Sequence, residues 1–131
     1  MKGLRKVARA AVSNRSGTSH FDPSGNPAMG CLADGGPLAV DTVALDELVR
    51  EGAVPRPDLM KIDVEGGALR VLQGGRHCLE EARPAIILSA HGWRLFDDCQ
   101  QLLRSIGYEQ EVEKDGSEDG DYLVIARSRT V

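Results

Sequence analysis

Two acidic residues, Asp63 and Glu65, end the apolar segment at residues 59–64 and are the first candidates for chemistry. They stand two positions apart, and the alternation of a β-strand would place both carboxylates on one face. Such a pair can bind a divalent cation, orient a hydroxyl group, or divide acid and base roles between its members. The alternative is structural: Asp63 caps the following helix and Glu65 complements the helix dipole.

His91 and Trp93 follow a second apolar segment, at residues 85–88. The imidazole of His91 is a candidate general base or substrate ligand, with a structural hydrogen bond as the alternative. Trp93 is either a wall of a substrate site or a plug in the core. The sequence contains no G-x-G-x-x-G loop, Walker loop, nucleophile elbow or H-E-x-x-H motif, so these residues remain the candidates.

Apolar periodicity predicts the elements that must position these four residues. We expect strands at residues 7–12, 38–43, 59–64 and 85–88, an extended stretch at 18–21, and helices over 45–51, 68–82 and 95–106. An antiparallel hairpin is expected at residues 108–113 and 122–126. This order predicts an α/β fold with a parallel sheet and an antiparallel C-terminal edge. Ligands of such sheets bind beyond the carboxyl ends of the strands, where the candidate residues fall.

The length of 131 residues is that of one domain, which we assign to residues 1–131. Residues 22–37 are rich in glycine and proline and predict a long flexible loop, whereas residues 38–131 form the regular α/β core. Gly74 and Gly75 interrupt the helix predicted over residues 68–82, and a close approach of this helix to the sheet would explain them.

Composition narrows the class of partner. The chain has 16 basic and 20 acidic residues and a net charge of -4, which disfavours nucleic acid or an anionic membrane as a partner. No apolar run approaches the length of a membrane span. The three cysteines are widely spaced and form no C-x-x-C pair, so we predict no metal site and a reducing, cytoplasmic setting.

Four segments of the chain resemble one enzyme family. PDLMKIDVEGGALRVLQGG (residues 57–75) resembles the hallmark of FkbM-type S-adenosylmethionine-dependent methyltransferases, a strand of the form D-L-I-K-I-D-V-E-G followed by a helix. AAVSNRSG (10–17), TVALDEL (42–48) and RPAIILSAH (83–91) with IGY (106–108) resemble further segments of the family, in the same order.

The resemblance implies a partial Rossmann-like class I methyltransferase domain that uses S-adenosylmethionine. Its intact relatives would methylate a hydroxyl oxygen of a sugar or secondary metabolite, so the partner would be a small-molecule or glycan acceptor. Asp63 would orient the acceptor and His91 would act as general base. Glu65 and Trp93 would bind the substrate, Glu65 also supporting the strand–helix turn. The residues that bind the cofactor are not assigned.

The chain also departs from the family pattern. It opens at about the third strand, so we expect the N-terminal half with the D-x-G-A-N-x-G cofactor loop to be absent. The strand at residues 59–64 would then lie at an open sheet edge, through which we expect self-association. The family has glutamate where Ala68 and Ser89 stand. A non-catalytic remnant or interaction module is therefore an alternative function, and an unrelated carboxylate–metal enzyme is a third.

Overall fold

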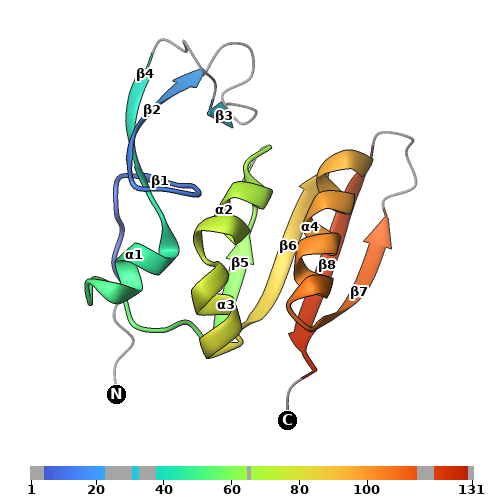
Figure 1. The fold of residues 1–131 in the computed structure, drawn as a ribbon. Helices are drawn as coiled ribbons and strands as arrows, with labels where there is room; N and C mark the ends of the chain where they lie inside the picture. Colours follow the sequence, from blue (N-terminus) through green and yellow to red (C-terminus); the bar gives the residue numbers. More distant parts are fainter. Residues whose placement is uncertain (1–4, 23–30, 33–37, 65, 115–119, 130–131) are drawn as a thin grey trace.

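The chain forms two separate β-sheets and four helices in the residues that the computed structural model describes, which are 5–22, 31–32, 38–64, 66–114 and 120–129. The first sheet has the strand order β1-β4-β2-β3 and the second β5-β6-β8-β7 (Figure 1). The α/β class is thus confirmed. The prediction that residues 38–43 and 59–64 share one parallel sheet is wrong, because β4 pairs with β1 and β2 while β5 begins the second sheet.

The first sheet is built around β4 (Leu38–Val43), which β2 (Gly17–Asp22) joins in antiparallel pairing. β1 (Ala11–Val12) pairs with β4 over these two residues alone, so the strand expected from residue 7 is shorter than predicted. Val7 is 87% exposed and has no strand to pack on. β3 (Cys31–Leu32) pairs with β2, so the predicted loop at residues 22–37 is not wholly irregular. Residues 23–30 and 33–37 of that loop lie outside the described residues.

The second sheet combines one parallel pair with an antiparallel hairpin. β5 (Leu59–Ile62) runs parallel to β6 (Ala85–His91). The predicted hairpin is confirmed as β7 (Tyr108–Lys114) and β8 (Asp121–Ser128), but β8 inserts antiparallel between β6 and β7. This sheet is therefore mixed rather than mainly parallel. Because β6 extends to residue 91, the candidate histidine is the last residue of the strand.

The helices that follow β5 and β6 lie on one side of the second sheet (Figure 1). α1 (Leu45–Arg50) leads out of the first sheet, and α4 (Trp93–Ser105) follows β6. The single helix predicted over residues 68–82 is two helices, α2 (Ala68–Gly74) and α3 (Arg76–Ala82), which meet at Gly75. No helix in the described ranges is long and apolar enough to span a bilayer.

Gly74 is where the first sheet meets the helices. A Cβ atom built on it would lie 2.2 Å from the carbonyl oxygen of Ser13 and 2.9 Å from the Cα of Asn14. Only a residue without a side chain permits this contact between α2 and the turn that follows β1. A close approach at the glycine pair is present, but the predicted neighbour is wrong, because Gly74 meets the turn after β1 and not a sheet.

The core lies between the second sheet and the helices. Side chains that alternate along β6 and β8 pack under the helices, with Leu72 and Leu79 of the helical layer fully buried; the strand residues are Ile86, Leu88, Ala90, Tyr122, Val124 and Ala126. The opposite sheet face is less covered, and Leu59 on β5 is 59% exposed. β5 ends the sheet as far as the described residues go, as expected for an edge strand. Self-association through this edge stays a prediction.

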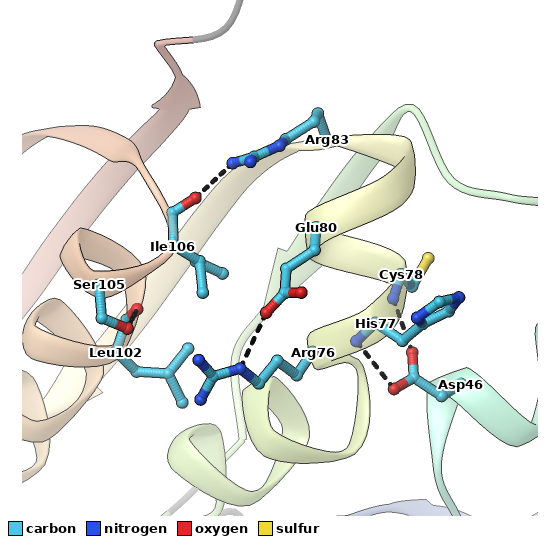
Figure 2. Close-up of polar contacts among 9 residues, drawn as sticks. All are labelled: Asp46, Arg76, His77, Cys78, Glu80, Arg83, Leu102, Ser105 and Ile106. Carbon is cyan, nitrogen blue, oxygen red and sulfur yellow. Dashed lines mark hydrogen bonds and ion pairs between the residues drawn. The ribbon is translucent and has the colours of Figure 1, made fainter.

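Polar contacts tie α3 to its neighbours (Figure 2). The carboxylate of Asp46 on α1 accepts hydrogen bonds from the backbone N–H groups of His77, at 3.0 Å, and Cys78, at 2.8 Å. At the other end of α3, the guanidinium of Arg83 donates to the carbonyl oxygen of Ile106, beyond the end of α4. The N-cap residue of α3 is Gly75, which has no side chain to accept a hydrogen bond. The contacts from α1 and α4 stabilise α3 in place of such a cap.

We expect Asp46→Ala to lower the free energy of unfolding by about 1–2 kcal/mol, because two N–H groups at the start of α3 lose their acceptor. Asp46→Asn keeps one acceptor oxygen and should cost less. Urea unfolding measures both variants, with Glu47→Ala as the control for loss of a neighbouring negative charge on α1. Equal losses for Asp46→Ala and Glu47→Ala would contradict the capping role.

The cysteines Cys78 and Cys99 are buried, free thiols, as predicted for small apolar residues. Burial raises the pKa of Cys99 to about 12, with a smaller contribution from the charge of Asp98. Burial also raises the pKa of Cys78, and the nearby carboxylate of Asp46 adds to this effect. Neither thiol therefore has the thiolate character of a nucleophile near neutral pH.

Tyr108 gives the fold a specific sensitivity to alkali. Its hydroxyl is buried and donates a hydrogen bond of 2.7 Å to the carbonyl oxygen of Pro84. Burial raises the pKa of Tyr108 from 10.0 to about 12, an effect that the charge of Arg83 partly offsets. The unfolded chain ionises at the lower value, so the contribution of Tyr108 to stability is complete below about pH 10 and is lost as pH rises towards 12.

We therefore expect Tyr108→Phe to reduce the loss of stability in alkali, while costing about 1 kcal/mol near neutral pH through the missing hydrogen bond. Urea unfolding of both proteins at a series of pH values from neutral to alkaline measures this difference. The lysines ionise in both proteins, so their effect cancels in the comparison. Parallel pH profiles for the two proteins would show that Tyr108 does not cause the alkaline loss.

Candidate functional site

His91 and Asp121 form a hydrogen-bonded pair at the carboxyl end of β6. The antiparallel register of β6 and β8 sets these two residues opposite each other. The Nδ1 atom of His91 lies 2.6 Å from Oδ1 of Asp121. A carboxylate can only accept, so the proton of this bond lies on Nδ1, and the neutral ring then carries its lone pair on Nε2. The side chains are 57% and 65% exposed, so a ligand can reach the pair.

Gly92 shapes the turn that follows this pair. Its φ of 85° lies in the left-handed region, where a side chain would be strained. The Gly92 N–H donates to the carbonyl oxygen of Gly120 at 3.2 Å, which extends the pairing of β6 and β8 past His91. The turn thus fixes the histidine at the strand end and starts α4 at once with Trp93.

Trp93 stands at the rim of an aromatic cluster. Its ring centroid is 5.6 Å from that of Phe96 and 6.2 Å from that of Tyr122, which stack on each other at 4.1 Å. Trp93 is 60% exposed, so the prediction of a core plug is wrong and the substrate wall remains. His91 alternates with the buried Ala90 and points to the sheet face away from the helices. The two candidates therefore share one sheet edge but lie on opposite faces.

Asp63 lies exposed just past the end of β5. It does not cap α2, whose N-cap position is Gly67 and has no side-chain hydrogen bond. The capping alternative for Asp63 is therefore wrong. Ile62 pairs with Leu88 in the register of β5 and β6, so Asp63 and His91 both lie towards the carboxyl edge of the sheet. Glu65 falls outside the described residues.

The comparison with known proteins decides the family. The family model described as the methyltransferase FkbM domain matches residues 3–109 of this chain. The chain belongs to the FkbM methyltransferase family. Hexuronic acid methyltransferase AglP of Haloferax volcanii is 32% identical to this FkbM chain over 121 residues, covering 91% of the chain and 50% of the relative. The chain thus spans about half the length of this curated relative.

A solved structure shares the fold. The crystal structure of methyltransferase FkbM from Methylobacillus flagellatus KT matches the FkbM chain with a TM-score of 0.59 and 16% sequence identity. The match covers 92% of this chain and 28% of that one. At this identity the likeness bears on the fold alone, and it agrees with the family predicted from the sequence segments.

The two positions at which this FkbM chain departs from the family pattern, Ala68 and Ser89, lie in different surroundings. Ala68, the first residue of α2, is fully buried in the core. Ser89 is half-buried on β6 and lines a small cavity of about 190 Å³ together with Asp121 and Tyr122. The serine position therefore borders the His91–Asp121 pair, whereas the alanine position belongs to the packing of α2.

Sequence reasoning missed Asp121. The hairpin was expected to resume at residue 122, one position too late. If the second strand of the hairpin had been started at residue 121 and paired with β6, Asp121 would have been placed opposite His91. Among the described residues, no three His, Cys, Asp or Glu side chains lie close enough to hold a metal ion.

Proposed function

We propose that this FkbM chain takes part in S-adenosylmethionine-dependent O-methylation and that its acceptor is an acidic sugar. The observation that carries the proposal is the His91–Asp121 pair at the carboxyl edge of the second sheet, in a chain of a methyltransferase family. Support for the acceptor comes from AglP, whose name states that it methylates a hexuronic acid. We further propose that β5, β6 and the hairpin are part of a Rossmann-like sheet, and that the buried free thiols belong to a reducing, cytoplasmic setting.

His91 is the proposed general base. Asp121 holds the proton on Nδ1, so that Nε2 can take the proton of the acceptor hydroxyl. The carboxylate also stabilises the imidazolium that forms, as an acidic partner does for other catalytic histidines. Asp63 would orient the acceptor at the end of β5. Trp93 lies on the other face of this sheet edge, so its exposed ring would contact a part of the sugar away from the reacting hydroxyl.

The described residues do not make a site for S-adenosylmethionine on their own. The ribose diol and the ammonium group of this donor both need hydrogen-bond acceptors. At the carboxyl edge, the described carboxylates include an Asp121 that already accepts from His91, and the exposed Asp63 and Glu113. The last two belong to opposite ends of the sheet, since one follows β5 and the other lies on β7. The larger cavities, of about 620 and 560 Å³, are lined by other residues. Binding of the donor therefore requires groups beyond the described residues, and we derive no step through it.

This mismatch favours a second candidate, a non-catalytic interaction module. The exposed apolar residue Leu59 supports it, because it lies on β5, the last strand of the second sheet among the described residues. A sheet edge of this kind presents unpaired backbone groups to another chain. Under this alternative, the family fold is retained as a docking unit without methyl transfer.

Titration of the 131-residue chain with S-adenosylmethionine by calorimetry separates the two candidates. The enzyme proposal expects saturable binding, followed by transfer of a labelled methyl group to glucuronate in preference to glucose. Neither binding nor transfer with the chain alone would refute the proposal for this chain and favour the interaction module.

A further inference from the structure

A polar cavity of about 440 Å³ lies between the first sheet and α2, apart from the histidine pair. Its volume falls within the range of about 300–1,000 Å³ that is typical of ligand pockets. The wall consists of the turn after β1, the start of β2, one residue of β4 and one residue of α2: Ser13, Asn14, Arg15, Gly17, Thr18, Ser19, Thr42 and Arg70.

The cavity is cationic. Arg15 and Arg70 both line it, and its lining side chains in the described part of the chain include no acid. Neither guanidinium takes part in an ion pair with another described residue. Both arginines are exposed, so their donors face solvent or a ligand. Two guanidinium groups at one opening suit a carboxylate, which a planar fork of donors binds with two parallel hydrogen bonds.

The fold fixes the two arginines near each other. Arg70 and Gly74 are one helical turn apart and so share a face of α2. Gly74 lets the backbone of Ser13 and Asn14 approach that face, which carries the neighbouring Arg15 to the same place. The hydroxyl of Thr42 donates to the carbonyl oxygen of Arg15 at 3.0 Å and holds the turn on β4.

The remaining lining residues are neutral hydrogen-bonding groups. Thr18 and Ser19 carry hydroxyls and Asn14 carries an amide, which match the hydroxyl groups of a sugar ring. Arg70 stands in the first turn of α2, the helix that follows the carboxyl end of β5.

We propose that this cavity binds the carboxylate of an acidic sugar through Arg15 and Arg70, with the neutral groups around it contacting the ring hydroxyls. The inference rests on the proposed function for its choice of ligand and adds the residues that select it. Arg15 and Arg70 are positioning and specificity residues in this scheme, and neither takes part in proton transfer.

The test is titration of the full chain, observed by amide NMR, with three probes at constant ionic strength: glucuronate, glucose and inorganic phosphate. Glucuronate should shift the signals of residues 13–19 and 70 and bind more tightly than either other probe. Arg70→Gln and Arg15→Gln should each weaken glucuronate binding by about tenfold or more, because each removes a charge-assisted contact. Binding of glucose should change little in these variants.

Arg104→Gln is the matched control, since it removes an exposed helix arginine that lines a different cavity. It should leave glucuronate binding unchanged. Equal binding of glucose and glucuronate, equal loss in all three variants, or phosphate binding as tight as that of glucuronate would overturn the assignment. Glucuronate binding through the two arginines without any methyl transfer would instead refute the proposed function and leave the cavity assignment standing.

Discussion

Gly74→Ala is expected to lower the free energy of unfolding by about 1–3 kcal/mol, the cost of forcing an extra group into a packed site. The added Cβ would meet the Ser13 carbonyl oxygen at 2.2 Å and the Asn14 Cα at 2.9 Å. Both are backbone atoms, which cannot rotate away as a flexible side chain can. Alanine improves helix propensity by up to about 1 kcal/mol in a helix interior, but Gly74 is the last residue of α2, where this gain is smaller.

The control for this prediction is Gly67→Ala at the other end of the same helix. A Cβ at Gly67 would lie 3.6 Å from a methyl group of Val64, an ordinary contact. Urea unfolding with an unchanged m-value should show a clear loss for Gly74→Ala and little change for Gly67→Ala. Because the turn after β1 must move, the first variant should also weaken glucuronate binding at Arg15. If both variants unfold at the wild-type urea concentration, α2 and the turn are less tightly packed than the structure shows.

Local patterns in the sequence predicted elements better than they predicted sheet membership. The hairpin of β7 and β8 followed from its alternation, and the strand at residues 38–43 was correct. The expectation that it shares one parallel sheet with the strand at residues 59–64 was wrong, because the choice of partner depends on contacts between β4 and β2 that are distant in sequence. The break between α2 and α3 falls at Gly75, and the start of α3 is held by Asp46 from α1. Helical periodicity alone carries no sign of that contact.

The candidate site was predictable to the extent that sheet geometry controls it. The rule that ligands bind at carboxyl ends of strands selected His91 and Asp63, and the structure places both towards that edge. To predict Asp121 as the partner of His91, one needs the register between β6 and β8, which local sequence patterns do not give. Arg70 lies on the exposed face of a helix, where arginine is ordinary, and only the packing at Gly74 brings Arg15 to it.

His91→Gln is expected to reduce kcat for methyl transfer by about 10²–10⁴-fold, the usual contribution of general acid–base catalysis. Glutamine keeps a polar group at the strand end but cannot take a proton from the acceptor. Asp121→Asn should give a smaller loss, because it weakens the orientation of the ring without removing the base. Initial rates with saturating acceptor measure both variants, and the KM for the acceptor should change little.

His77→Gln is the matched control for this prediction, because His77 is an exposed histidine on α3 that lines another cavity. His91 is also largely exposed, so its loss should leave the urea unfolding midpoint near that of the wild type. A fall in kcat without a fall in stability therefore separates proton transfer from a structural hydrogen bond. Partial recovery of His91→Ala by added imidazole would further identify the missing group as a base. Full activity in His91→Gln would assign His91 a structural role and move the search for the base to Asp63.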